Sequence, residues 1–171
     1  MRIETDIKLD YNDVLIRPKR STLNSRSQVR LERKFSFRNS KTDYEGVPIM
    51  AANMDGVGTF EMADKLAEGN IFTCLVKTYT AEQLTEYFNS NIPERTNNVA
   101  MSIGTSDADF LKLVDVHARV TNQLKYVCMD IANGYSDHFA ARVRKVRDQF
   151  PDLVIIAGNV VTREMTEELI L

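Results

Sequence analysis

Two charged residues directly follow apolar runs, where a buried strand would end. Lys77 comes after IFTCLV (71–76), and Asp130 ends the apolar part of KYVCMDIA (125–132). A Lys beside apolar side chains can have a lowered pKa and act as an acid or base, and a carboxylate accepts hydrogen bonds from a ribose hydroxyl, an amide or a Lys. Each residue also has a simpler interpretation, in which Lys77 marks the strand end and reaches water and Asp130 braces a loop.

Other polar residues lie at the starts of expected helices. Thr105 and Ser106 precede a helical pattern, whose N-terminus can bind an anion, although plain N-capping is the alternative. Gly134 follows Asn133 in a turn signal and is expected to supply a positive φ. His117 and His138 lie inside expected helices without a nearby partner in the sequence, and we interpret both as structural.

The two cysteines, Cys74 and Cys128, lie inside the apolar runs FTCLV and YVCMD. Residues in such runs are usually buried, so both are expected to be structural thiols. Neither has CxxC spacing or a neighbouring His, and no metal site is therefore predicted in these residues. Free thiols are typical of a reducing compartment.

Strands and helices alternate along the chain, which indicates a parallel sheet. Expected strands start near residues 47, 71, 99, 126 and 153. Each precedes a segment with helical spacing of apolar residues, at 59–68, 80–89, 106–120, 136–150 and 162–171. Thr80 and Gln83 match a capping box at the start of the second helix. Because the strands are almost entirely apolar, both faces of the sheet are expected to be buried.

Two architectures fit this alternation, an open doubly wound sheet and a (β/α)8 barrel. The chain has no GxGxxG after a strand, which disfavours the open sheet. A barrel needs eight units and typically about 250 residues, and five units are recognisable here. The last helix ends on Leu169, Ile170 and Leu171 with no stop signal. We therefore expect a single partial barrel domain over residues 1–171, with its site at the carboxyl ends of the strands.

The charge balance is nearly even, with 22 Lys and Arg against 24 Asp and Glu, which argues against a nucleic-acid-binding protein. Seven of the basic residues fall between Arg17 and Lys34, within an N-terminal arm of about residues 1–45. This arm is either a solvated surface segment or one that reaches a phosphate or a neighbouring subunit. No segment resembles a signal peptide or a membrane span, so a cytoplasmic protein is expected.

Five segments resemble GMP reductase, a family related to IMP dehydrogenase. They are LDYNDVLIRPKRSTLNSRS (9–27), GVPIMAANMDGVGTFEMA (46–63), GTSDADF (104–110), DIANGYSDHF (130–139) and AGNVVTREMTEELIL (157–171). The resemblance runs from about residue 3 to residue 171. The basic stretch RPKRSTLNSRS, with DIANGYS and AGNVVT, is typical of the reductases rather than the dehydrogenases.

This resemblance implies a homotetrameric (β/α)8 barrel that converts GMP to IMP and ammonia with NADPH, in purine nucleotide salvage. In the family a Cys attacks C2 of the purine, ammonia leaves, and a hydride arrives from the cofactor. That Cys, a potassium site and most GMP-phosphate contacts follow strand six, beyond Leu171. Cys74 and Cys128 match no nucleophile position. The 171-residue chain alone is therefore expected to be inactive and, with unpaired edge strands, poorly soluble.

Matched motif by motif, the resemblance assigns mostly cofactor contacts to this chain. Two residues of the arm, Ser25 and Arg26, correspond to positions that reach NADPH bound to a neighbouring subunit, and Lys77 to a Lys associated with the cofactor and deamination. The remaining residues that the resemblance assigns to the cofactor lie at the carboxyl ends of two expected strands. They are Thr105, Ser106, Asp130, Ile131 and Ala132.

The substrate side is represented by Asn53, Met54 and Asp55, which match the loop that closes under the nucleotide base. The resemblance also places Lys77 near Asp130, where an ion pair would keep the ammonium protonated for donation to departing ammonia. The chain departs from the family at Gly56, where a Thr is usual, and around Lys77, where the usual His-Lys-His is Val76-Lys77-Thr78. A non-catalytic nucleotide-binding or partner-modulating fragment, and an IMP dehydrogenase-like oxidoreductase, remain the alternatives.

Overall fold

The computed structural model describes residues 3, 5–90, 93–120 and 122–171, and it divides the chain into two compact units, Met1–Arg30 and Leu31–Leu171. The first unit holds two short 3-10 helices, η1 (Tyr11–Asp13) and η2 (Arg26–Gln28), and its described residues are exposed. The expected arm of residues 1–45 crosses this division, because a strand pair begins in its last part.

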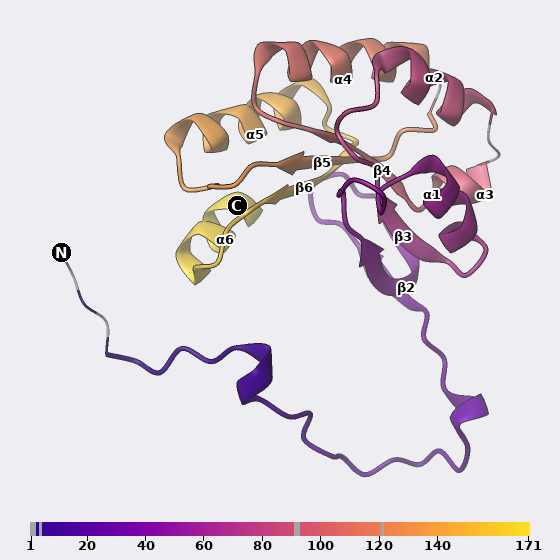
Figure 1. Ribbon diagram of the computed structural model, residues 1–171, viewed down its shortest axis with the longest axis vertical. Helices are drawn as coiled ribbons and strands as arrows, with labels where there is room; N and C mark the ends of the chain where they lie inside the picture. Colours follow the sequence, from indigo (N-terminus) through magenta and orange to yellow (C-terminus); the bar gives the residue numbers. More distant parts are fainter. Residues whose placement is uncertain (1–2, 4, 91–92, 121) are drawn as a thin grey trace. The chain divides into compact units, whose positions relative to one another are not determined.

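The second unit is built on a six-stranded sheet in the order β1-β2-β3-β4-β5-β6 (Figure 1). Strands β2 to β6 are parallel, as the alternation predicts, and β1 pairs antiparallel with β2, which the sequence analysis did not predict. The strands are β1 (Arg33–Ser36), β2 (Asp43–Ala51), β3 (Ile71–Cys74), β4 (Val99–Ile103), β5 (Tyr126–Asp130) and β6 (Val154–Gly158).

Of the six α-helices in the described residues, five coincide with the predicted helical segments, and the short α3 is additional. The helices are α1 (Phe60–Ala67), α2 (Ala81–Ser90), α3 (Pro93–Thr96), α4 (Asp107–Arg119), α5 (Asp137–Gln149) and α6 (Arg163–Ile170). The predicted capping box of α2 is confirmed, because the backbone N–H of Thr80 donates to Gln83 Oε1 at 2.9 Å and that of Gln83 donates to Thr80 Oγ1 at 3.2 Å. None of the described helices is long and apolar enough to cross a membrane.

One face of the sheet is covered by α1, α2, α4 and α5 (Figure 1). Their apolar sides meet alternate residues of the central strands, and the side chains at the centre of this core are fully buried: Phe88, Leu113, Phe139 and Val146 from the helices, and Val99, Met101, Val127 and Met129 from the strands. Burying each such side chain stabilises the fold by roughly 1.5–3 kcal/mol. The core fixes the strands and thus the loops at their carboxyl ends.

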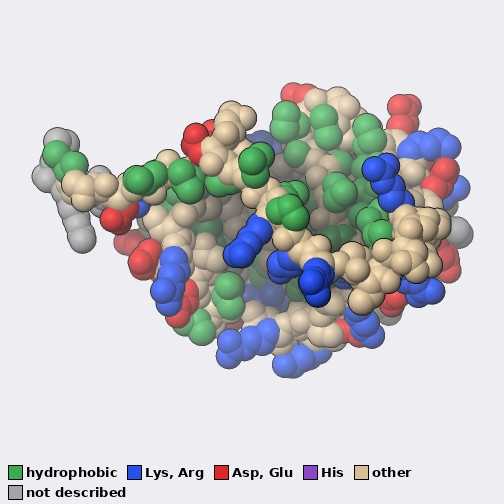
Figure 2. Space-filling view, turned by 90° about the horizontal axis from the view of Figure 1, so that it is seen from below, with side chains coloured by type: hydrophobic (Ala, Val, Ile, Leu, Met, Phe, Trp, Pro, Cys, Tyr) green, Lys and Arg blue, Asp and Glu red, His purple; other side chains and the backbone are tan. Residues whose placement is uncertain are grey.

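The opposite face of the sheet carries a second cluster built around aromatic rings. The rings of Phe72 on β3 and Tyr126 on β5 pack edge to face at 4.9 Å between centroids. A cavity of about 260 Å³ on this face is lined by Met50 of β2 together with Val154 and Ile156 of β6. Strands β2 and β6 are separated by three others, so the sheet must curve to bring them to one cavity. Figure 2 shows hydrophobic side chains exposed among charged ones on the side of the molecule seen from below.

Candidate functional site at the carboxyl ends of the strands

Asp130, the last residue of β5, is the centre of a polar cluster formed by three strand ends. Asn53, two residues after β2, donates from Nδ2 to Asp130 Oδ2 at 3.0 Å. Asn159, the first residue after β6, donates from Nδ2 to Asp130 Oδ1 at 3.0 Å. Both carboxylate oxygens are therefore oriented by amide donors. We refer to Asn53, Asp130 and Asn159 as the Asp130 cluster.

Curvature of the sheet makes the Asp130 cluster possible. Strands β2 and β5 are third neighbours, and in a flat sheet they would lie about 14 Å apart. The side chains of Asn53 and Asp130 are too short to bridge that separation. The sheet must therefore curve, so that the loop after β2 comes close to the end of β5. This curvature brings polar side chains from distant strands into contact.

The loops after β5 and β6 are joined by backbone hydrogen bonds that hold Asn159 in place. The N–H of Ile131 donates to Gly158 O, and the N–H of Asn159 donates to Ile131 O, each at 2.9 Å. Asn159 Nδ2 also donates to Ile131 O at 2.8 Å. Asn159 lies at the carboxyl end of an expected strand, where the sequence places the site, but its hydrogen bonds to Asp130 and Ile131 were not predicted.

Gly134 and Tyr135 complete the contact between these loops. The expectation that Gly134 supplies a positive φ is wrong, because Gly56 is the glycine with a positive φ among the described residues. Gly134 is needed for a close approach instead, since a Cβ there would lie 2.8 Å from Asn159 O. Tyr135 Oη accepts from the N–H groups of Val161 and Thr162 at 2.7 and 2.8 Å, and no sequence motif indicated this role.

Lys77 is exposed at the same end of the sheet, but the expected ion pair with Asp130 is absent among the described residues. The carboxylate of Asp130 instead accepts hydrogen bonds from the side-chain amides of Asn53 and Asn159. Lys112 on α4 supports the Lys77 segment by donating to Lys77 O at 2.7 Å and to Tyr79 O at 3.3 Å. Burial lowers the pKa of Lys112, and the nearby charge of Lys77 lowers it further.

Ser106 is committed to capping α4. Its hydroxyl accepts from the Asp109 N–H at 3.1 Å, and the Ser106 N–H donates to Asp109 Oδ2 at 3.3 Å, which together form a capping box. The hydroxyl also donates to Asp109 Oδ2 at 2.6 Å. The carboxylate of Asp109 beside this N-terminus disfavours a second anion, so the geometry favours capping over anion binding. The neighbouring Thr105 O lies 3.3 Å from His138 Nε2 on α5, a partner for His138 that the sequence did not reveal.

The other predicted site residues are exposed or partly exposed. Met54 and Asp55 lie in the loop after β2 and are exposed, and the next residue, Gly56, has φ 74°. This conformation favours glycine, which gives a physical reason for the departure from the family's Thr. In the first unit, Ser25 caps η2 by accepting from the N–H of Ser27, and the exposed Arg26 begins that helix.

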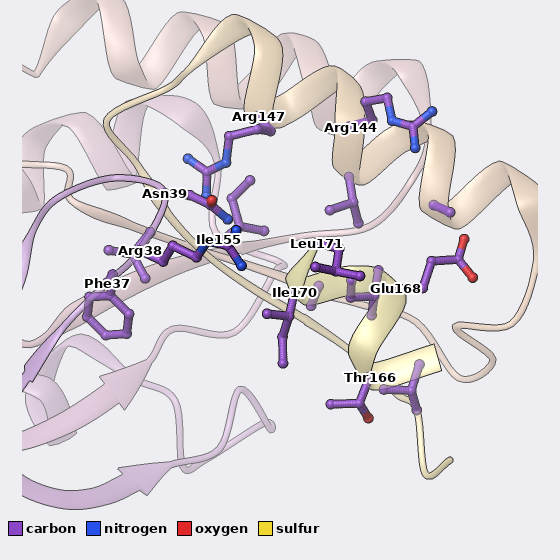
Figure 3. A pocket seen from close by; sticks show the side chains of 16 residues that line it. Phe37, Arg38, Asn39, Arg144, Arg147, Ile155, Thr166, Glu168, Ile170 and Leu171 are labelled. Carbon is purple, nitrogen blue, oxygen red and sulfur yellow. The ribbon is translucent and has the colours of Figure 1, made fainter. Parts of the chain in front are cut away.

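A pocket of about 460 Å³ does not contain any of the predicted site residues. It lies between α5, β6, α6 and the turn at Phe37–Asn39 (Figure 3). Arg147 in this pocket donates to three backbone carbonyls, those of Phe150, Pro151 and Leu153. Its guanidinium therefore stabilises the turn that connects α5 to β6. Because no predicted site residue lines this pocket, the Asp130 cluster remains the better candidate site.

The chain is similar to known proteins along nearly its whole length. The family model described as IMP dehydrogenase / GMP reductase domain matches residues 8–171, and the chain belongs to this family. It is 54% identical over 171 residues to GMP reductase of Shewanella pealeana, covering 100% of this chain and 49% of that protein. It is also 54% identical over 169 residues to GMP reductase 2 of Bos taurus, covering 99% of this chain and 48% of that protein.

A solved structure shows the same fold at lower sequence identity. The crystal structure of inosine 5′ monophosphate dehydrogenase from Legionella pneumophila superposes with a TM-score of 0.74 at 21% identity, covering 92% of this chain and 46% of that one. The chain thus spans about half the length of the curated relatives and of the solved structure that it matches.

Proposed function

We propose that this chain forms the first five β/α units of a (β/α)8 barrel, in a protein that reduces GMP to IMP and ammonia with NADPH. Family membership and the 54% identity to proteins named GMP reductase support the reaction. The strong curvature of the parallel sheet supports the barrel. The observation that carries the proposal is the Asp130 cluster, where three strand ends converge as barrel enzymes require.

The residues at this end of the sheet suit a nucleotide cofactor. When bound, NADPH supplies the hydride. Asp130 has both carboxylate oxygens oriented, and the adjacent Ile131 and Ala132 provide backbone and apolar surface beside it. The exposed guanidinium of Arg26 suits the phosphate groups, as a fork of N–H donors. We propose that Ser25 and Arg26 serve the cofactor of a neighbouring subunit in a homotetramer.

Lys77 and Asp130 support the deamination, and the nucleophilic Cys belongs to the part of the protein after Leu171. The exposed ammonium of Lys77 donates a proton to the amino group at C2, which would leave poorly as an amide anion and departs as neutral ammonia once protonated. Asp130, held by its two Asn partners, accepts a hydrogen bond from the bound nucleotides and orients them. Asn53, Met54 and Asp55 close the site below the purine base. Thr105 and Ser106 complete the rim.

The remaining proposals concern the whole protein. A potassium ion would bind in the part of the barrel that follows these residues. GMP and IMP are the small-molecule substrate and product, in purine nucleotide salvage in the cytoplasm. Neither a nucleic acid nor a membrane is required as a partner.

Two substitutions in the full-length protein test this site. Lys77→Met should lower kcat for GMP by about 100-fold, because general acid–base groups typically contribute at least that factor. Asp130→Asn should lower kcat and raise KM for NADPH. Lys65→Met is the matched control, since Lys65 is an exposed α1 residue paired with Glu68. Equal activity of the Lys77→Met and Lys65→Met variants would contradict the proposed role of Lys77.

A further inference from the structure

The ammonium group of Lys112 binds the turn that follows β3. Lys112 lies on α4, and its Nζ donates to Lys77 O at 2.7 Å and to Tyr79 O at 3.3 Å. One side chain thus holds two carbonyl groups of the turn at residues 77–79, from a helix 33 to 35 positions further along the chain. Burying an ammonium group is costly unless it is hydrogen-bonded, and these two carbonyls supply that compensation.

The chain on either side of this turn is fixed by other hydrogen bonds. Before the turn, the N–H of Val76 donates to Gly58 O at 2.8 Å. After the turn, Thr80 and Gln83 form the capping box of α2. The turn therefore lies between two fixed points, and Lys112 holds the carbonyl groups within it.

The ring of Tyr79 attaches the far end of the turn to two helices. It stacks on Phe60 of α1 at 3.9 Å between ring centroids, with the planes 15° apart, and its Oη accepts from the Phe60 N–H at 3.3 Å. Phe60 stacks in turn on Tyr87 of α2 at 4.4 Å. This attachment acts at Tyr79, two residues after Lys77, so the carbonyl of Lys77 relies on its own bond to Lys112.

The position of Lys112 is set by the start of α4. Ser106 and Asp109 form the capping box that fixes this end of the helix, and Lys112 follows Asp109 by three residues, on the same side of the helix. Burial lowers the pKa of Lys112, and the carboxylate of Asp109 opposes this shift. The ammonium group thus has a neighbouring negative charge as well as two carbonyl acceptors.

We propose that Lys112 is a positioning residue for the deamination step, because it fixes the backbone from which the Lys77 side chain extends. This inference rests on the proposed function, in which Lys77 donates a proton to the amino group at C2. Lys112 is not itself the acid, since its Nζ is engaged with two protein carbonyls. Both bonds reach main-chain oxygens, so they do not depend on the side chains at positions 76 and 78, where this chain has Val and Thr.

Steady-state kinetics of the full-length protein separate positioning from a merely structural role. Lys112→Met removes the donors from a side chain of similar length. It should lower kcat for GMP about tenfold, with less than a twofold change in KM for GMP, since displacing a reacting group by about 1 Å can cost up to about 100-fold in rate. Lys112→Arg keeps the charge and the donors and should recover most of the lost kcat.

Lys125→Met is the matched control for these variants. Lys125 also anchors a loop, because its Nζ donates to Asn97 Oδ1 at 2.6 Å. These two residues precede β5 and β4, at the opposite end of the sheet from Lys77. Lys125→Met should therefore leave kcat unchanged, and equal kcat values for Lys112→Met and Lys125→Met would overturn the proposal.

A double-mutant cycle shows whether Lys112 acts through Lys77. The variant that carries both Lys77→Met and Lys112→Met should have the kcat of Lys77→Met alone, because the acid that Lys112 positions is already absent. A further tenfold loss in the double variant would overturn the proposal. Thermal unfolding checks that each variant is folded. If Lys112→Met does not fold, Lys112→Gln, which is polar but too short to keep both bonds, should show the same loss of kcat.

Hydrogen–deuterium exchange gives a readout that does not require the reaction. The amides of residues 77–79 should exchange faster in Lys112→Met than in Lys125→Met, and equal exchange would overturn the proposal. If the unchanged full-length protein does not reduce GMP, the proposed function fails and the role of Lys112 in deamination fails with it. If it does reduce GMP and Lys112→Met has no effect on kcat, only the inference about Lys112 fails.

Discussion

Asn53 Nδ2 donates to Asp130 Oδ2 at 3.0 Å, a hydrogen bond that joins the end of β2 to the end of β5 across 77 residues of sequence. Two intervening strands separate these residues in the sheet. The bond thus reports directly on the curvature that turns a parallel sheet towards a barrel. It also orients the carboxylate that we place at the centre of the proposed site.

Asn53→Ala should lower the free energy of unfolding by about 1.5–3 kcal/mol, the usual contribution of a hydrogen bond to a charged group. Urea denaturation measures the change. Asp55→Ala is the matched control, since Asp55 is exposed in the same loop. A loss of the same size in the Asp55→Ala variant would contradict a stabilising role for the bond between Asn53 and Asp130.

Tyr135→Phe should release the N-terminus of α6. The Tyr135 oxygen accepts from the N–H groups of Val161 and Thr162, and phenylalanine removes that acceptor. Amide hydrogen exchange at Val161 and Thr162 should become faster by about tenfold, which corresponds to about 1.4 kcal/mol for the lost bonds. Tyr11→Phe, at an exposed residue of the first unit, is the control. Unchanged exchange at both amides would contradict the account.

The strand and helix order could be predicted from the sequence because each element has a strong local signal. The strand LVIIAG, for example, is an apolar run between Pro151 and a polar loop, and the structure places β6 at Val154–Gly158. Strand β1 was missed because RKFS is exposed throughout and has no apolar pattern; it exists through pairing with β2.

The candidate site could be predicted only in part. The sequence draws attention to Asp130 because it ends a buried strand and to Lys77 because it comes soon after one, and their roles stay predictions. The hydrogen-bond partners of Asp130 could not be predicted. They depend on a curvature of the sheet that brings Asn53 and Asn159, which are 106 positions apart in the sequence, to the same carboxylate.

Ser106→Ala should destabilise the protein by about 1 kcal/mol at neutral pH through loss of the α4 cap. Part of this loss should disappear in acid. Burial of Asp109 raises its pKa, but hydrogen bonds from the Ser106 hydroxyl and from the backbone prevail and hold that pKa below its usual range. Asp109 therefore contributes stability above the unfolded-state pKa of about 4, and this contribution is lost as the pH falls through the lower folded-state value.

Urea unfolding from pH 2 to pH 7 measures this dependence. Ser136→Ala is the matched control, because Ser136 caps α5 by accepting from the N–H of Phe139 and has no carboxylate partner in that cap. The loss of unfolding free energy caused by Ser136→Ala should be independent of pH over this range. If the loss of unfolding free energy caused by Ser106→Ala is also independent of pH, Asp109 does not strengthen the cap.

The isolated 171-residue chain should not oxidise NADPH in the presence of GMP. Its two cysteines are buried on the sheet face opposite the helices, in the cluster around Phe72 and Tyr126, and neither is one of the three residues of the Asp130 cluster. Absorbance at the NADPH band provides the assay, with the full-length protein as the positive control. GMP-dependent oxidation by the pure chain would show that a nucleophile lies within these residues.

Product stoichiometry of the full-length protein tests the central claim most directly. With GMP and NADPH supplied, the account predicts one IMP, one ammonia and one NADP⁺ formed for each GMP consumed. IMP and ammonia are measured by chromatography and an ammonia assay, alongside the loss of NADPH absorbance. Oxidation of IMP with NAD⁺, without any reduction of GMP, would contradict the account and identify a dehydrogenase instead.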